Sequence, residues 1–332
     1  MKLMTGTGLA SKGLALGLVL TAALLPASAQ PKKLNIVLIP GLTTDGFYIT
    51  MRKGAEEAAK RLGVNLSFQG GPEFSATTQI PVLNAVIARK PDAILIAPTD
   101  KQQLIAPLKA ALDAGIKVIT VDTFIGDTGK YQTGSGVADF PLSYVASDNV
   151  EGGRVAARAL AAAIGGKGKV YVSNVKPGIS TTDQREQGFK EEMKKFPGVS
   201  VLETQFNDND TNKAASQFAA VLARNADLAG VFGTNLFSAQ GAANGVKTSG
   251  KKGAVKVVAF DAPESMVADI KSGTIDIAIA QHPAEMGQKG VEFAVAALSG
   301  KKVPTRYGTG YTVMNKGNID DPKIKAFLYS SK

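Results

Sequence analysis

The stretches KVITVD (117–122) and KVVAFD (256–261) decide the fold class of this chain. Each holds a continuous apolar run that ends on an aspartate and is followed by a loop and a helical pattern. Such runs are typical of buried strands in a parallel sheet, where ligands bind outside the carboxyl ends of the strands. We therefore expect Asp122 and Asp261 to face one crevice, formed by two similar lobes.

The sequence around these stretches alternates between strand and helix patterns. Strands are predicted at 34–39, 64–68, 93–98, 117–121, 169–173, 199–204, 229–233, 256–260, 275–280 and 311–314. Helices are predicted at 47–62, 75–89, 182–195, 211–224, 236–249, 264–272 and 284–299, with two more opened by Thr99 and Asp148. Those two residues have a Gln or Glu three positions later, as in a capping box, and Pro107 predicts a kink. The alternation predicts an α/β fold of two doubly wound parallel-sheet lobes.

A break in the pattern separates the two lobes. Residues 125–142 are rich in glycine and have no clear period, which predicts a long surface loop. The lobes are then expected at 30–146 plus 282–310 and at 147–281 plus 311–332. The chain would cross between them near Ala146–Ser147, Gln281–His282 and Tyr311, which predicts a three-segment hinge.

The first 29 residues have the pattern of a cleavable export signal. Lys2 and Lys12 form a short basic region, LALGLVLTAALL (14–25) is apolar, and Ala27-Ser28-Ala29 is a small-residue cleavage site. The sequence therefore predicts a periplasmic protein with residues 1–29 as its signal peptide. The chain has no cysteine, so disulfides, a lipid-anchored cysteine and a thiol nucleophile are excluded.

Several classes of site do not fit this composition. The formal net charge is +10, but the lysines are scattered and no arginine-rich stripe is present, so nucleic-acid binding is not expected. The single histidine, His282, forms no cluster for zinc or for a catalytic triad. The stretch NDNDTN (207–212) lacks the glycine and distal glutamate of a calcium loop, so Asp210 or Thr211 is expected to cap a helix. No metal or cofactor is expected.

Polar and aromatic residues recur just after the predicted strand ends. They are Asp45, Phe47, Tyr48, Asp122, Thr123, Arg185, Asn209, Asn235, Asp261 and Gln281. An aromatic ring offers an apolar face to the C–H side of a sugar, and the polar groups pair with hydroxyls. Two structural alternatives stay open: Phe47 and Phe260 as core residues, and Asp122 and Asp261 as helix caps.

Residues 34 to about 315 resemble the type I periplasmic sugar-binding proteins of ABC importers, especially the ribose-binding branch. The shared stretches are FYITMRKGAEEAAKRLG, IAPTD, VITVD, ASDN, REQGF, GTN, VAFDAPE and IAQHPAEMGQKGVE. The resemblance implies a monomer that captures a neutral sugar or polyol between two lobes by hinge closure and delivers it to membrane permease subunits. It places Asp45, Phe47, Tyr48, Asp122, Arg185, Asn235, Asp261 and Gln281 on ligand positions.

The chain also departs from that branch. Thr123 stands where the ribose binder has arginine, Ala97 where it has asparagine, and Asn209 where it has an aromatic residue. Ribose is therefore not indicated over another pentose, a hexose or a polyol. Three carboxylates against Arg185 favour a neutral ligand over an anionic one. The long loop offers Tyr131 or Phe140 to the cleft.

Other functions are weighed against sugar import. A sensor that feeds a chemoreceptor or sensor kinase is compatible with the same site. A sugar-responsive transcription regulator would need an N-terminal DNA-binding helix pair, where this chain has an export signal. An extracellular carbohydrate-processing enzyme would need a carboxylate pair set for chemistry, but the arginine and amide neighbours favour recognition.

Overall fold

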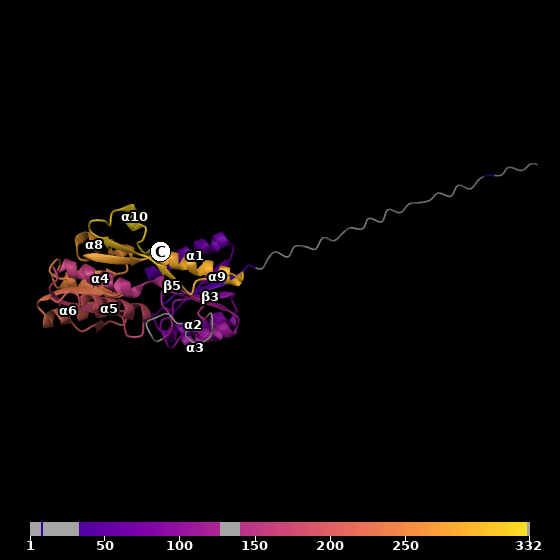
Figure 1. Ribbon diagram of the computed structural model, residues 1–332, viewed down its shortest axis with the longest axis horizontal. Coiled ribbons are helices and arrows are strands. Elements are labelled where there is room, and N and C mark those ends of the chain that lie inside the picture. Colours follow the sequence, from indigo (N-terminus) through magenta and orange to yellow (C-terminus); the bar gives the residue numbers. More distant parts are fainter. Residues whose placement is uncertain (1–7, 9–32, 127–139, 331–332) are drawn as a thin grey trace, which may run out of the picture. The chain divides into compact units, whose positions relative to one another are not determined.

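The computed structural model describes Gly8, residues 33–126 and residues 140–330 (Figure 1). The expected export signal, apart from Gly8, lies outside these residues, as does Tyr131 of the expected loop. Among the residues described, no helix combines the length and apolar character that a membrane crossing requires.

The first lobe is built on a six-stranded sheet in which every strand pairing is parallel. The strand order is β12-β5-β4-β3-β1-β2. Its strands are β1 (Asn35–Ile39), β2 (Asn65–Phe68), β3 (Ala93–Ile96), β4 (Lys117–Val121), β5 (Ser143–Ser147) and β12 (Arg306–Thr309). Its helices are α1 (Gly46–Leu62), α2 (Ala76–Ala88), α3 (Ile105–Asp113) and α9 (Pro283–Leu298).

Both faces of this sheet are covered by helices. Ile36 and Leu38 of β1 point into a core shared with α1 and α9. Val37 and Ile39, the alternate residues, point into a second core with α2 and α3. Figure 1 shows the two helix pairs on opposite sides of β3. Because β1 is buried on both faces, its sequence is a continuous apolar run.

The second lobe repeats this plan. Its sheet has the order β13-β11-β10-β9-β6-β7, with β8 also paired to β6, and only β13 runs antiparallel to its neighbour. The strands are β6 (Gly168–Asn174), β7 (Val199–Val201), β8 (Gln205–Phe206), β9 (Leu228–Gly233), β10 (Lys256–Phe260), β11 (Ile277–Gln281) and β13 (Tyr311–Asn315). The helices are α4 (Asn149–Ala163), α5 (Ser180–Met193), α6 (Thr211–Arg224), α7 (Leu236–Thr248), the 3-10 helix η1 (Glu264–Met266), α8 (Val267–Ser272) and α10 (Pro322–Lys325).

The α/β fold with two parallel-sheet lobes is therefore confirmed. In the second lobe α4 packs with α5 and α6 packs with α7, one pair on each sheet face. The chain passes from one sheet to the other three times: between β5 and α4, between β11 and α9, and between β12 and β13. The exact lobe bounds and the hinge motion stay predictions.

Two local predictions about the helix after β3 are wrong. Thr99 does not cap it, because the Thr99 amide and hydroxyl donate to Gln79 Oε1 at 2.9 and 3.0 Å. The helix begins six residues later, at Ile105. Pro107 therefore lies in its first turn, where a missing N–H is tolerated. The other expected cap is confirmed, since Asp148 Oδ1 accepts from the Glu151 amide at 3.1 Å.

Phe140 is not at the cleft. Its side chain is completely buried in the core beneath α2 and α3, together with Ile125 at the other end of the expected loop. Three short strands, β5, β8 and β12, and the helix α10 were not predicted from the sequence.

Candidate functional site

One cavity is lined by side chains from both lobes. It holds about 420 Å³ of space between protein atoms, part of it open to solvent. The first lobe contributes Asp45, Phe47, Tyr48, Phe74 and Asp122. The second lobe contributes Val175, Ile179, Thr181, Thr182, Arg185, Asn209, Asn235, Asp261 and Gln281.

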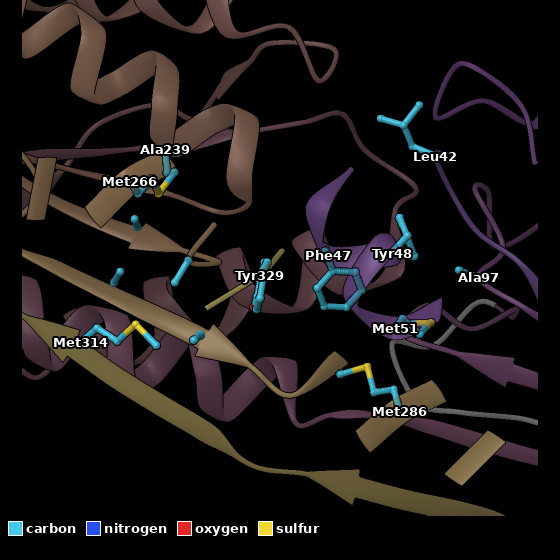
Figure 2. Close-up of a cluster of buried hydrophobic side chains, with 14 of the residues drawn as sticks. Leu42, Phe47, Tyr48, Met51, Ala97, Ala239, Met266, Met286, Met314 and Tyr329 are labelled. Carbon is cyan, nitrogen blue, oxygen red and sulfur yellow. The ribbon is translucent and has the colours of Figure 1, made fainter. Parts of the chain in front are cut away.

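The first-lobe wall is organised by the start of α1. Asp45 is the N-cap residue of this helix, and its Oδ1 accepts from the Phe47 amide at 2.9 Å. The Tyr48 hydroxyl donates to Asp122 Oδ2 at 2.7 Å, which ties α1 to the carboxyl end of β4. The Phe47 ring makes edge-to-face contacts with Tyr48 and Tyr329, at centroid distances of 5.1 and 5.5 Å respectively. Figure 2 shows Phe47 between these two residues.

Asp261 is the most heavily hydrogen-bonded carboxylate of the cavity. Its Oδ1 accepts from Gln281 Nε2 at 2.9 Å and from the Tyr329 hydroxyl at 3.1 Å, and its Oδ2 accepts from the Leu236 amide at 3.2 Å. These contacts also orient Gln281. The Gln281 Oε1 atom is buried and has no hydrogen-bond partner among the described residues.

Arg185 is held rigidly in the second-lobe wall. Its Nε donates to Asn149 Oδ1 at 2.8 Å and its Nη1 donates to the Thr234 carbonyl at 2.9 Å. The guanidinium carbon lies 3.9 Å from the centroid of the Phe260 ring, a cation–π contact. Phe260 is completely buried, so the open question about this residue is resolved in favour of the core, where it supports the arginine.

Two glycines bring α5 close enough to α4 to place this arginine. A β-carbon on Gly153 would lie 2.0 Å from the Arg185 carbonyl oxygen, and one on Gly188 would lie 1.9 Å from the Val150 carbonyl oxygen. Only glycine permits such a close approach of two backbones.

Two asparagines form a linked pair on the same wall. Asn235 caps α7, with its Oδ1 accepting from the Ser238 amide at 3.0 Å. Its Nδ2 donates to Asn209 Oδ1 at 2.7 Å. Asn209 and the preceding Asp208 have positive φ, and Asp210 caps α6 as one of the two expected alternatives.

Burial and mutual repulsion change the acidity of the first-lobe carboxyls. Asp45 is only partly buried in the cavity wall, and desolvation there, with smaller contributions from Asp261 and Asp122, raises the pKa of this carboxyl to about 7. Burial raises the pKa of Asp122 to about 6, against the opposing effects of Arg185 and the Tyr48 hydroxyl. Burial and the neighbouring carboxylates hold the pKa of Tyr48 well above its usual value, so this side chain stays a donor.

All the expected site residues except Thr123 line the cavity. Thr123 is buried, and its hydroxyl donates to the Pro98 carbonyl at 2.7 Å. Asp122 caps none of the helices within residues 33–126 and 140–330, whereas Asp261 accepts from the first amide of α7. Whether the lining residues contact a ligand stays a prediction.

Five lining residues were missed from the sequence. They are Phe74, Val175, Ile179, Thr181 and Thr182. Phe74 lies in the segment between β2 and α2, and Val175 directly follows β6, so both have the same strand-end signal in the sequence as the predicted site residues. The threonines lie in the first turn of α5, which begins at Ser180 rather than at the predicted residue 182. Thr182 Oγ1 is buried without a partner in the described part of the chain.

Comparisons with known proteins agree with this architecture. The model of the periplasmic binding protein domain family matches residues 36–302. The chain is 32% identical to the ribose import binding protein of Salmonella typhimurium over 289 residues, which cover 87% of this chain and 93% of the relative.

Solved structures give the same result. An ABC transporter solute-binding protein from Agrobacterium vitis, bound with α-D-tagatopyranose, is 69% identical with a TM-score of 0.87, covering 90% of this chain and 99% of that one. A carbohydrate transporter solute-binding protein from Agrobacterium radiobacter, in complex with D-arabinose, is 30% identical with a TM-score of 0.83, covering 90% and 100%. The alternative of a carbohydrate-processing enzyme is therefore wrong. The chain belongs to the periplasmic binding protein family, as a ribose-binding-like sugar solute-binding protein of the ABC importer type.

Proposed function

We propose that this protein captures a neutral monosaccharide or polyol in the cavity between its lobes and delivers it to the membrane permease of an ABC importer. The protein acts as a monomer in the periplasm, after removal of residues 1–29. The lobes are 30–146 plus 282–310 and 147–281 plus 311–332, and the three chain crossings serve as the hinge.

The observation that carries this proposal is the mixed origin of the cavity lining. Asp45 and Asp122 come from the first lobe, while Arg185, Asp261 and Gln281 come from the second. A ligand that hydrogen-bonds to both sets favours the arrangement in which the lobes are together. Delivery then depends on the permease recognising that arrangement, as expected for a component of an importer.

The chemistry of the lining favours a sugar without charge. Carboxylate, amide and guanidinium groups pair with hydroxyls, and Phe47 and Phe74 offer apolar surface to the ring. An anionic ligand would meet three carboxylates and a single arginine in a site of reduced dielectric. The tagatose bound to the Agrobacterium vitis protein makes a ketohexose the first ligand to test.

Titration calorimetry tests the proposal. D-Tagatose, D-arabinose, D-allose and D-ribose are compared with D-galacturonate, and at least one neutral sugar is expected to bind in the micromolar range or more tightly. Asp122→Asn is expected to weaken that binding about tenfold, because a charge-assisted hydrogen bond becomes a neutral one. The matched control is Asp113→Asn, an exposed carboxylate of α3 paired with Lys109. Binding of the sugar acid alone would contradict the proposal.

A further inference from the structure

The negative and positive charges of the cavity lining are unequal in number. The lining contains Asp45, Asp122 and Asp261 but a single cation, Arg185, so full ionisation gives −3 + 1 = −2. Arg185 forms no ion pair within residues 33–126 and 140–330, since its Nε and Nη1 donate to an asparagine and a backbone carbonyl. Carboxylates that share a site of reduced dielectric without direct ion pairs resist complete ionisation.

The three carboxylates differ in how well their charge is stabilised. Asp261 accepts three hydrogen bonds. Asp122 accepts from the Tyr48 hydroxyl and is stabilised by the charge of Arg185. Asp45 accepts only one hydrogen bond, from the Phe47 amide to Oδ1, and its Oδ2 has no partner in the described part of the protein. If one of the three carboxylates keeps a proton, Asp45 is therefore the one expected to be protonated.

Two other polar atoms of the cavity lining are available to accept hydrogen bonds from a ligand. Gln281 Oε1 and Thr182 Oγ1 are buried, lack partners among the described residues and belong to side chains that line the cavity. Both can accept from hydroxyls of a ligand. Sugars also carry ring, ether or carbonyl oxygens that only accept, and these need a donor.

On the basis of the proposed function, we propose that Asp45 binds the sugar as a neutral carboxylic acid that donates from Oδ2 to a ligand oxygen. One proton is then bound with each sugar molecule. Asp45 is thereby a specificity-determining residue, because it requires an acceptor at one ligand position. The raised pKa of Asp45, about 7 by burial, agrees with this assignment.

The groups around Asp45 define the pH range of the effect. Tyr48 of α1, Asp122 at the end of β4 and Asp261 at the end of β10 interact electrostatically with Asp45. Arg185 of α5 lines the same cavity, and Tyr329 of the C-terminal segment donates to Asp261. The pKa values of both tyrosines are raised by burial, so they keep their protons in the range considered.

The sign of the pH dependence follows from the direction of the Asp45 shift. When the lobes separate and water enters, this carboxyl returns toward its ordinary pKa of about 4. Between about pH 4 and 7 the free site is ionised while the occupied site is protonated, so binding takes up a proton. Sugar affinity therefore falls as pH rises through this range, by up to about tenfold per pH unit, and levels off above about pH 7.

Calorimetry of D-tagatose binding between pH 5 and 8.5 tests the inference. At pH 6, titrations in buffers of different ionisation enthalpy count the protons, and the wild type is expected to take up about one proton per sugar more than Asp45→Asn does. Asp45→Asn keeps a good helix cap and a neutral donor, so its affinity is expected to lose the pH dependence between about pH 6 and 7. It should keep only the part that Asp122, with a pKa of about 6, contributes at lower pH. His282→Gln removes the single histidine and is expected to keep the wild-type slope.

The outcomes separate the two proposals. Sugar binding with a flat pH profile and no proton uptake in the wild type would overturn the inference while the proposed function stands. A slope between about pH 6 and 7 that is as steep in Asp45→Asn as in the wild type would also overturn it. If none of the neutral sugars binds at any pH, the proposed function falls, and the inference with it.

Discussion

At the residue scale, the two aspartates that directly follow β4 and β10 have the same unusual backbone conformation. Asp122 and Asp261 have φ of 60° and 75°, in the left-handed region that few residues other than glycine adopt. Each amide still continues its sheet, donating to Val145 or Ile279 of the neighbouring strand at 2.9 Å. The turn after each strand therefore directs the carboxylate toward the cavity.

Arg185 should not tolerate replacement by lysine. Arg185→Lys keeps the charge but loses the planar group that bonds Asn149 and Thr234 and lies on Phe260. We expect the free energy of unfolding to fall by about 2–3 kcal/mol and sugar affinity to fall at least tenfold. Urea unfolding and calorimetry measure the two effects.

The matched control for this substitution is Arg158→Lys on α4. Arg158 is about half exposed and forms ion pairs with the exposed Glu151 and with the buried Glu192. Lysine keeps the charge that both pairs need, so the free energy of unfolding should fall by less than about 1 kcal/mol. If both substitutions changed the unfolding free energy and the sugar affinity equally, the contacts of Arg185 would not be needed for the site.

Thr123 is expected to affect stability but not binding. Thr123→Val removes the buried hydrogen bond to the Pro98 carbonyl and should lower the free energy of unfolding by about 1–2 kcal/mol. Because the side chain does not line the cavity, the affinity for D-tagatose should stay within about twofold of wild type. A large loss of affinity at unchanged stability would contradict this expectation and indicate that Thr123 contacts the ligand.

The case of Thr123 shows what the sequence can predict about single residues. A position after a strand end is visible in the sequence, so Asp45, Asn235 and Gln281 were predicted to lie where the structure places them. Which side of the chain a residue faces there depends on local φ and ψ. Thr123 directly follows a residue with positive φ, and the sequence contains no signal for that turn.

At the element scale, the contact between α4 and α5 controls the position of Arg185. In Gly188→Ala the new methyl group would overlap the Val150 carbonyl, so the helices must separate. We expect a loss of about 2–3 kcal/mol in unfolding free energy, together with weaker sugar binding. Chemical denaturation and calorimetry provide the two values.

Gly308→Ala is the control for this prediction. Gly308 lies in β12, and an added β-carbon there meets no atom within 4 Å. Its stability should change by less than about 0.5 kcal/mol. If Gly188→Ala were equally mild, close helix packing would not explain the position of the arginine.

Helices and strands were predicted correctly from the sequence where their own residues have a clear apolar pattern. The runs that form β1, β4 and β10 are buried on both faces, so each is a continuous apolar stretch. β5 is also fully buried, but it begins and ends with serine, and β12 (RYGT) is short and largely exposed. The failed cap at Thr99 depends on Gln79, which lies twenty residues earlier on another helix. Such contacts are set by tertiary structure.

At the scale of the whole molecule, the fold converts two similar lobes into one site. Neither lobe alone supplies the full set of groups, because the aromatic rings come from the first and the arginine and amides from the second. The chain crosses between the two sheets at β5–α4, β11–α9 and β12–β13, and we expect the lobes to move about these three crossings. Ligand can shift this motion only through contacts made on both sides.

Small-angle X-ray scattering, with and without saturating D-tagatose, tests this central claim most directly. Calorimetry on the same sample establishes that the sugar is bound. If both lobes contact the same ligand, the radius of gyration falls on binding and the apparent mass remains that of a monomer. An unchanged radius with the sugar bound would contradict capture by closure.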